Sequence, residues 1–324
     1  MSLKAAVIGL GNISGAHIKG WQGTDGVELV AGADVRQEAA DRAAEAHGIA
    51  AYTDWRKMLD EQGADIVSIC TPPAFHREAA VEALERGIHV MCEKPMAAAV
   101  ADAEAMAAAA ERAESIMMVA FCHRFHGTAM KARQLIDEGV LGRPVYFRGA
   151  FTGKADMVGN HRAQMSLAGG GSLMDNGSHA ADLYQFLLGK VANVSCRAGT
   201  FLQDLETDDV AVMIFEGENG CFGEIITGYS MPGDFTQWRI VGEKGVLEIV
   251  DYFSGPVRFT SAETGEATDY EADNSETRFD RQFRHFVECV KAGTQPISNA
   301  QTALHTQRII DAAYRAAEAK GIAI

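Results

Sequence analysis

Residues 5–15 read AAVIGLGNISG, an apolar run of strand length that leads directly into closely spaced glycines. Gly9 permits a tight turn, and Gly11 leaves room for backbone N–H groups to approach a pyrophosphate at the start of a helix. Ser14 stands at the third position of this fingerprint, where glycine or alanine is usual. The stretch therefore predicts a strand, a turn and a helix that together bind a dinucleotide.

An acidic residue follows this turn at the spacing that a dinucleotide-binding unit requires. Asp34 comes directly after the apolar run Glu28–Ala33, about 20 residues beyond the turn. A carboxylate at this position binds ribose hydroxyls and repels a 2′-phosphate, which favours NAD over NADP. Arg36 offers the alternative, because its guanidinium could instead hold that phosphate.

The first third of the chain repeats this strand-and-helix pattern. Helical segments Gln37–His47 and Ala74–Arg86 are each followed by a glycine where a helix would stop. Between such segments lie short runs that are apolar on both faces, as buried parallel strands require. These runs are Ala5–Gly9, Glu28–Ala33, Asp65–Cys70, His89–Cys92 and Ile116–Phe121. The pattern predicts an α/β fold, with a doubly wound parallel sheet forming a Rossmann domain over residues 1–122.

The pattern changes after residue 122. Longer strand-like runs alternate with connectors rich in Gly, Asn and Asp, which is typical of antiparallel hairpins. The runs are Val145–Thr152, Val191–Leu202, Val210–Glu216, Cys221–Tyr229, Thr236–Val241 and Val246–Val250. One helix from near Ser172 to Gly189 interrupts them, and a last helix covers Ala300–Lys320. Residues 123–324 are therefore predicted to form an α+β domain with an open, mainly antiparallel sheet.

Composition narrows the possible partners and compartment. The chain has 324 residues, and its 29 Lys and Arg against 44 Asp and Glu give a net charge of −15. So acidic a surface makes nucleic acid and anionic membrane poor partners. The six cysteines form no CxxC pair, and no signal peptide is visible, so we expect a reduced, cytoplasmic protein.

Two short loops follow predicted strands at the edge of the sheet where doubly wound folds bind ligands. Thr71-Pro72-Pro73 follows Asp65–Cys70, and its prolines would stiffen a loop beside the nicotinamide. Glu93-Lys94-Pro95 follows His89–Cys92. The Lys94 ammonium could bind a substrate oxygen and stabilise a developing alkoxide. The Lys94–Pro95 bond is a candidate for the cis form. A merely stiff loop and a surface lysine are the alternatives.

A second group of polar residues lies in the stretch GGGSLMDNGSHAAD at 169–182. Asp175 and His179 are four residues apart and Asp182 is three further on, so all share one face of a helix. An aspartate beside a histidine orients the imidazole and raises its basicity, as a general base needs. The alternative is an acidic helix start and a buried structural histidine.

A zinc site is a further alternative for this group. His179, Asp175 and either His123 or His126 could supply ligands. No cysteine and no second spaced histidine pair supports this interpretation in the sequence, so we expect no metal.

The ordered set of Gly9-x-Gly11, Thr71-Pro-Pro, Glu93-Lys94-Pro95 and Gly-Gly-Gly-Ser-Leu-Met-Asp175-x-Gly-x-His179 resembles the Gfo/Idh/MocA family over the whole chain. The resemblance implies metal-independent hydride transfer between NAD(P) and a hydroxyl carbon of a sugar, polyol or related compound. Ser14 departs from the family pattern, and so does His161, where many members carry tryptophan before the residue that matches Arg162.

The resemblance also implies roles for particular residues. Lys94, Asp175 and His179 match the family's catalytic residues, and with Arg124 and Asn160 they are predicted to bind the substrate or stabilise its site. The predicted cofactor-binding residues are Gly9, Gly11, Asn12, Ile13, Asp34, Arg36, Thr71, Pro72, His76 and Glu93.

We therefore expect an NAD-dependent dehydrogenase of a sugar, polyol or inositol-like compound. Two alternatives share the fold. One is a redox-neutral glycosidase that keeps its NAD bound, and the other is a non-catalytic sugar or dinucleotide sensor. The presence of both Lys94 and His179 argues against the sensor.

The second domain also predicts self-association. The runs Val210–Phe215 and Glu224–Tyr229 are apolar on both faces, and few helices follow Gly189 to cover them. An exposed apolar sheet is an association surface. We expect a homodimer or tetramer formed through this sheet, as the family resemblance also implies.

Overall fold

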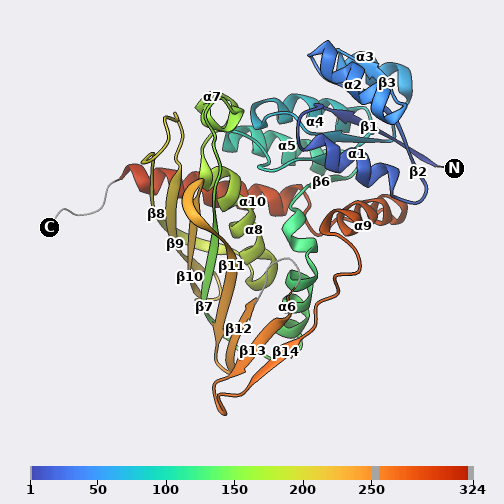
Figure 1. Ribbon diagram of the computed structural model, residues 1–324. Coiled ribbons are helices and arrows are strands. Elements are labelled where there is room, and N and C mark those ends of the chain that lie inside the picture. Colours follow the sequence, from blue (N-terminus) through green and yellow to red (C-terminus); the bar gives the residue numbers. More distant parts are fainter. Residues whose placement is uncertain (1, 250–254, 320–324) are drawn as a thin grey trace. The chain divides into compact units, whose positions relative to one another are not determined.

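The computed structural model describes residues 2–249 and 255–319 (Figure 1). The chain divides into two compact units. The first comprises Met1–Phe121 and Phe279–Leu304, and the second comprises Cys122–Arg278 and His305–Ile324. Among the described residues, no helix is both long and apolar enough to cross a membrane.

The first unit is built on a six-stranded parallel sheet in the order β3-β2-β1-β4-β5-β6. Its strands are β1 (Leu3–Ile8), β2 (Val27–Ala33), β3 (Ala50–Tyr52), β4 (Ile66–Ile69), β5 (His89–Cys92) and β6 (Met117–Val119). Every neighbouring pair within it is parallel. The prediction of a doubly wound parallel sheet is confirmed, although the three-residue strand β3 was not predicted.

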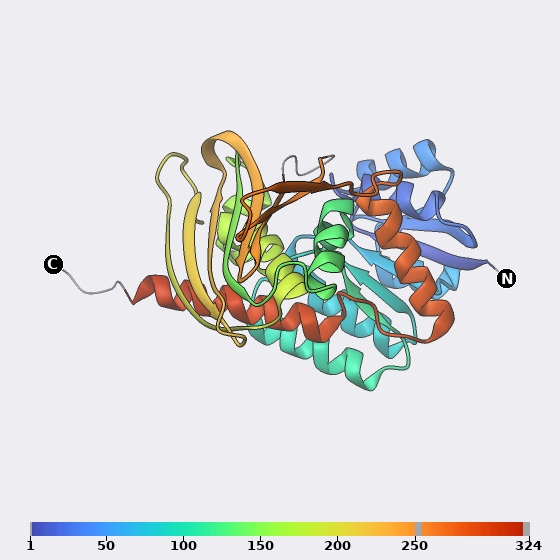
Figure 2. The same ribbon diagram turned by 90° about the horizontal axis from the view of Figure 1, so that it is seen from below.

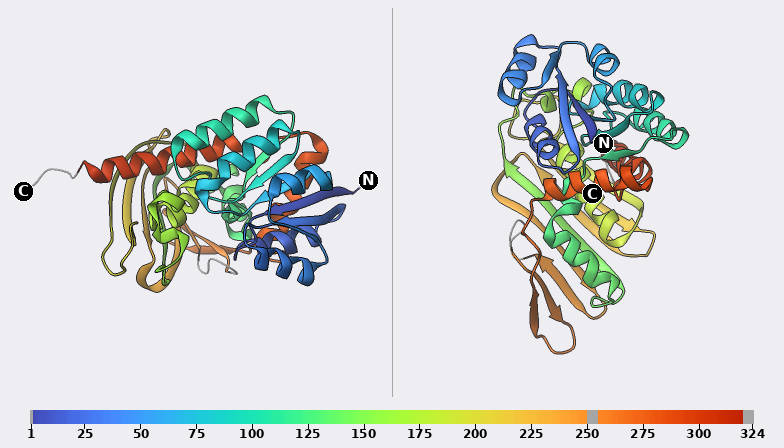
Figure 3. Two further views of the ribbon diagram at one scale, coloured as in Figure 1. Left: turned by 90° about the horizontal axis from the view of Figure 1, so that it is seen from above. Right: turned by 90° about the vertical axis from the view of Figure 1, so that its right-hand side faces the viewer.

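Helices lie on both faces of this sheet (Figure 3). They are α1 (Ser14–Gln22), α2 (Gln37–His47), α3 (Trp55–Gln62), α4 (His76–Glu85), α5 (Val100–Arg112), α9 (Arg278–Ala292) and the start of α10 (Ala300–Glu318). The helix predicted at 74–86 begins as a 3-10 turn, η1 (Pro73–Phe75), before α4. Gly48 ends α2 in the left-handed conformation at φ +67°, which glycine adopts without strain.

Helix α9 belongs to the first unit although it lies far along the chain. The ring of Phe283 packs edge-on against Trp21, with centroids 4.5 Å apart. A Cβ on Gly20 would stand 2.3 Å from that phenyl ring, so only glycine allows this approach. Ser298 then joins the sheet edge, where its carbonyl accepts from the Val119 amide at 2.9 Å.

The second unit contains an eight-stranded sheet in the order β14-β13-β12-β11-β7-β10-β9-β8. Its strands are β7 (Pro144–Lys154), β8 (Val191–Gly199), β9 (Val210–Gly217), β10 (Phe222–Gly228), β11 (Ser230–Gly242), β12 (Gly245–Ile249), β13 (Val257–Ser261) and β14 (Ala267–Tyr270). The mainly antiparallel sheet is confirmed. The strands are not all joined as simple antiparallel hairpins. Strand β10 pairs with β7 in parallel, and β7 lies between β10 and β11.

Several elements of the second unit differ from the prediction. Strands β13 and β14 were not predicted, and neither was helix α6 (Gly127–Asp137), which precedes β7. The expectation of a single helix among the strands is wrong, because the short α7 (Met165–Ala168) comes before α8 (Ser178–Leu188) between β7 and β8. The predicted ends Val250 and Lys320 lie outside the described residues.

Helices α6 and α8 and the rest of α10 lie on one side of this sheet (Figure 2). Ala132, Tyr184 and Ile310 from these helices are buried with Phe147 and Met213 from the sheet. Apolar side chains also lie on the other face, where Val212, Ile214 and Phe222 are exposed.

Candidate functional site

The glycine turn after β1 has the geometry that its sequence predicts. Gly9 has φ +88°, and a Cβ there would stand 2.8 Å from the carbonyl carbon of Cys70 and the nitrogen of Thr71. Gly11 is exposed, and apart from its two chain neighbours no described residue has an atom within 4 Å of where its Cβ would be. Asn12 is exposed beside it and Ile13 is half-buried, directly before α1. The turn thus presents bare backbone at a helix N-terminus that carries no acidic residue in its first turn.

Asp34 and Arg36 form a pair at the end of β2. The Asp34 carboxylate accepts from the Leu10 amide at 2.9 Å, from the Arg36 amide at 2.9 Å and from the Arg36 guanidinium at 3.0 and 3.1 Å. Burial alone would raise the pKa of Asp34, but these hydrogen bonds outweigh it and hold that pKa below its ordinary value. The Arg36 side chain is 62% exposed. Both predicted residues therefore lie beside the turn, and they already contact each other.

The loops after β4 and β5 are fastened together by His76. This imidazole is fully buried, with Nε2 at 2.8 Å from the Thr71 carbonyl and Nδ1 at 3.1 and 3.2 Å from the carbonyls of Pro95 and Met96. Burial lowers the pKa of His76, against the opposing effect of these carbonyls. These hydrogen bonds hold the two loops in place, and the predicted cofactor-binding role of His76 stays a prediction.

Glu93 is held in place by His17 of α1. Its buried carboxylate lies 2.9 Å from Nε2 of His17, whose Nδ1 lies 2.9 Å from the Ser68 hydroxyl. Burial alone would raise the pKa of Glu93, but His17 and then Lys94 lower it below the ordinary value. The Lys94 amide also donates to this carboxylate at 3.1 Å. The Lys94–Pro95 bond is cis, as predicted.

Two buried side-chain atoms of this unit, the Thr71 hydroxyl and the Gln282 Oε1, have no hydrogen-bond partner among the described residues, and Thr71 lies in a predicted cofactor loop. Together with the bare backbone at Gly11 and the acceptor Asp34, the Thr71 hydroxyl fits the dinucleotide that the sequence predicts. Pro72 lies in the same half-buried loop.

Gly170 and Gly171 permit close packing in the second unit. A Cβ on Gly171 would stand 1.9 Å from the carbonyl oxygen of Asp208, and one on Gly170 would stand 2.3 Å from the hydroxyl of Tyr314. The Asp208 carboxylate accepts from the Gly171 and Leu173 amides at 2.9 Å each and from the Ser172 hydroxyl at 2.8 Å. It satisfies the free N–H groups where the helical segment begins. Sequence reasoning missed Asp208.

Asp175 lies in a π-helical turn, η4 (Leu173–Gly177), that leads into α8. Its carboxylate accepts from the Tyr229 hydroxyl at 2.9 Å and pairs with Nε of Arg162 at 3.0 Å. Asn160, a predicted substrate-binding residue, accepts from the Arg162 amide at 3.1 Å and so begins the turn η3 (His161–Ala163). Burial, and next the Asp175 charge, raise the pKa of Tyr229, so it remains a donor.

Arg124 forms a buried ion pair with Asp182. Its Nε and Nη2 donate to the two carboxylate oxygens at 2.7 and 2.6 Å, and the side chains are only 4% and 1% exposed. The pair joins the turn η2 (Cys122–Phe125) to α8. Both roles predicted for Arg124, substrate contact and stabilisation of the site, stay predictions, and the ion pair is consistent with the second.

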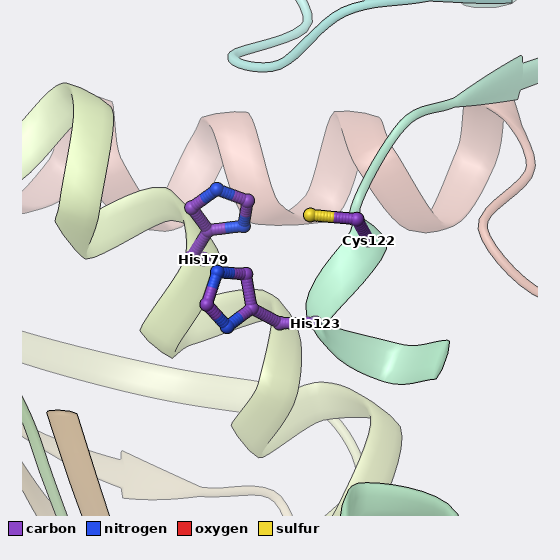
Figure 4. Close-up of side chains that lie close together, drawn as sticks. All are labelled: Cys122, His123 and His179. Carbon is purple, nitrogen blue, oxygen red and sulfur yellow. The ribbon is translucent and has the colours of Figure 1, made fainter. Parts of the chain in front are cut away.

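His179 lies on α8 against the residues that begin the second unit. Its ring centroid is 4.1 Å from that of His123. The donor atoms of Cys122, His123 and His179 all lie within 4.8 Å of one another, and the Cys122 sulfur points toward the His179 ring (Figure 4). The sequence argument that no cysteine accompanies these histidines is therefore wrong. The signal for it was the direct adjacency of Cys122 and His123.

Comparisons with known proteins identify similar oxidoreductases. Residues 3–121 match an oxidoreductase family with an NAD-binding Rossmann fold, and residues 129–248 match the Gfo/Idh/MocA C-terminal domain. The D-apiose dehydrogenase of Paraburkholderia graminis is 27% identical, over 97% of this chain and 87% of that protein. The scyllo-inositol 2-dehydrogenase (NAD(+)) of Bacillus subtilis is 28% identical, over 91% and 88%. The crystal structure of aldose-aldose oxidoreductase from Caulobacter crescentus, complexed with glycerol, is 28% identical and superposes with a TM-score of 0.90 over 99% of both chains.

Proposed function

The chain belongs to the Gfo/Idh/MocA oxidoreductase family, and from this premise we propose that it is an NAD-dependent, metal-independent dehydrogenase of a sugar, polyol or inositol-like substrate. Hydride would leave a hydroxyl-bearing carbon of that substrate. The names of the relatives support the substrate class, since they are dehydrogenases of a pentose and of an inositol.

The dinucleotide would be held by the first unit. Backbone N–H groups of the turn from Gly9 to Ile13 would bind the pyrophosphate at the start of α1. Asp34 would accept from the ribose hydroxyls, and the Thr71 hydroxyl would gain the partner that it lacks among the described residues. Arg36 is mostly exposed, so turning its guanidinium away from Asp34 costs little. When bound, the nicotinamide supplies the hydride acceptor.

Lys94 and His179 would handle the charge and the proton. The ammonium of Lys94 would hydrogen-bond the reacting oxygen and stabilise the alkoxide that develops on it. The imidazole of His179 would accept the hydroxyl proton, and Asp175 would orient that imidazole and stabilise its protonated form. These roles follow from the match of the three residues to the family's motif.

The observation that carries the proposal is how firmly Asp175 is held four residues before His179. Asp208 accepts from the Leu173 amide and so caps the turn that carries Asp175, while Tyr229 and Arg162 contact the Asp175 carboxylate. A protein that only senses a sugar has no need to hold a carboxylate and an imidazole one helical turn apart. A general base needs such fixed geometry, because it must be held at the correct distance and orientation to accept the substrate proton.

The test is net NADH formation with a panel of free aldoses, polyols and inositols. We expect at least one member to reduce NAD⁺ in proportion to time. Lys94→Ala should lower kcat by about 10²-fold or more while keeping NAD affinity, because the lysine acts on the alkoxide. Lys57→Ala is the matched control, since Lys57 is an exposed lysine of the same unit, and it should behave as the wild type.

Two results would contradict the proposal. Tightly bound NAD with no net NADH from any sugar, but cleavage of a glycoside, would indicate the redox-neutral alternative. Near-full turnover in Lys94→Ala would show that the lysine does not stabilise the reacting oxygen.

A further inference from the structure

Three side chains of the second unit bring potential metal-ligating atoms close together. The proposed reaction involves only one of them, His179. Cys122 and His123 are neighbours in the turn η2, and His179 comes from α8. One ligand atom from each lies within 4.8 Å of the other two. Cys122 and His179 are buried, and His123 is half-buried.

The two elements that carry these donors are locked together. Arg124 lies two residues after Cys122, and Asp182 lies one helical turn after His179. Their buried, two-point ion pair at 2.6 and 2.7 Å fixes η2 against α8. The donors are therefore held close before any ligand arrives, which reduces the ordering entropy that binding must overcome.

The donor types select the kind of cation. A thiolate and two imidazoles are the ligands of Zn²⁺ and similar soft or borderline metals, whereas Mg²⁺ and Ca²⁺ prefer oxygen. Tetrahedral Zn²⁺, with bonds of about 2.0–2.3 Å, needs donors about 3.3–3.8 Å apart. The three donor atoms lie within 4.8 Å of one another, so binding requires them to move closer together, and a fourth position would remain for water.

We propose that Cys122, His123 and His179 bind Zn²⁺ or a similar thiophilic divalent cation, and that the bound cation inhibits the enzyme. On binding, the Cys122 thiol loses its proton to solvent and the sulfur bonds the metal. A neutral imidazole has a single lone pair. His179 therefore cannot hold the cation and accept the substrate proton at the same time. The inhibitory half of this inference rests on the proposed function, and the binding half does not.

Binding is tested without activity, using Co²⁺ as a spectroscopic probe and Zn²⁺ in competition with a chromogenic chelator. We expect one ion per chain and a thiolate-to-cobalt absorption band. Cys122→Ser should abolish the band, and both Cys122→Ser and His123→Asn should weaken Zn²⁺ binding by about tenfold or more. Cys196→Ser, at a buried cysteine on β8 outside the cluster, is the matched control and should bind normally.

Either of two binding results would overturn the site. One is the absence of saturable Co²⁺ and Zn²⁺ binding by the wild-type chain. The other is an equal loss of affinity in Cys196→Ser and Cys122→Ser. His123→Asn keeps the question decidable if Cys122→Ser fails to fold.

Inhibition is tested on net NADH formation with an active sugar. Zn²⁺ should stop turnover, EDTA should restore it, and Cys122→Ser should keep the basal rate and lose the sensitivity. Stoichiometric binding without inhibition would overturn the inhibitory role. Loss of activity on EDTA treatment with recovery on adding Zn²⁺ would also overturn it, by making the cation catalytic. A chain that turns over no sugar but shows the Co²⁺ band would contradict the proposed function and leave the site confirmed.

Discussion

Asp34 shows how far a single residue could be predicted. Its place after β2 was clear from the sequence, because the glycine turn fixes the spacing. Its two-point contact with Arg36 was not predicted, because the sequence left Arg36 either turned outward or ready to hold a phosphate. The same limit applies to Asp175, whose partners Arg162 and Tyr229 come from distant parts of the chain.

The Asp34 carboxylate should set the cofactor preference. We expect wild-type kcat/KM to be higher with NAD⁺ than with NADP⁺, because a carboxylate repels the 2′-phosphate. Asp34→Ala should raise the ratio of NADP⁺ to NAD⁺ efficiency by about tenfold. Asp41→Ala, at an exposed aspartate of α2, should leave it unchanged. A tenfold wild-type preference for NADP⁺, unaffected by Asp34→Ala, would show that Arg36 decides instead.

Tyr229 should act as a positioning residue for Asp175. Its hydroxyl donates to the carboxylate, and its raised pKa keeps that proton in place through the working pH range. Tyr229→Phe should lower kcat about five- to tenfold, the size of about one hydrogen bond, with little change in the KM for NAD⁺. Tyr146→Phe removes a comparable bond to Glu224 on the sheet and should leave kcat unchanged. If both variants lose activity equally, Tyr229 is only structural.

At the scale of elements, local pattern explains both what was predicted and what was missed. The helix Gln37–His47 was predicted to the residue, because a glycine ends it and its apolar face is regular. Strand β3 has three residues and β14 is mostly exposed, so neither carries a clear alternation. Helix α9 did carry a signal, since Phe279, Phe283, Phe286 and Val287 repeat at helical spacing.

The loop between β8 and β9 should depend on Asp209. This buried carboxylate accepts from the amides of Phe201, Leu202 and Gln203 and from the Ser230 hydroxyl. Burial alone would raise the pKa of Asp209, but these bonds lower it below the ordinary 3.8. Asp209→Asn should therefore reduce the free energy of unfolding by about 2 kcal/mol at neutral pH.

The sign of the pH dependence follows from the lowered pKa. The unfolded chain binds this proton more readily, so the stabilisation is present above the ordinary pKa and is lost as pH falls through the folded-state value. In urea denaturation, the gap between wild type and Asp209→Asn should narrow on acidification. Asp156→Asn, at an exposed aspartate, should show no such gap. A gap that is constant with pH would mean that charge plays no part.

At the scale of the whole molecule, the return of the chain to the first unit could not be predicted from the sequence. Residues 279–304 return to the first unit, where they pack on α1 and the edge of β6. The parallel pairing of β10 with β7 likewise joins residues 76 positions apart in the sequence, as Phe222 with Tyr146 (222 − 146 = 76). Such pairings depend on which surfaces remain uncovered after local structure has formed, and no local pattern records that.

Self-association through the sheet of the second unit remains a prediction. The exposed face of that sheet identifies the residues whose substitution tests it. Ile214 on β9 is 56% exposed and Phe222 on β10 is 57% exposed, while α6, α8 and α10 cover the opposite face. Isolated exposed apolar residues are common, but here neighbouring strands present them together, as an interface with two-fold symmetry would.

We expect light scattering to give a multiple of the 34.8 kDa chain mass. Lysine at both positions, Ile214→Lys with Phe222→Lys, should reduce it to one chain mass, because like charges would meet across the symmetry axis. Met130→Lys, at an exposed methionine on α6, should leave the assembly intact. A wild-type chain that is monomeric at micromolar concentration would exclude this interface.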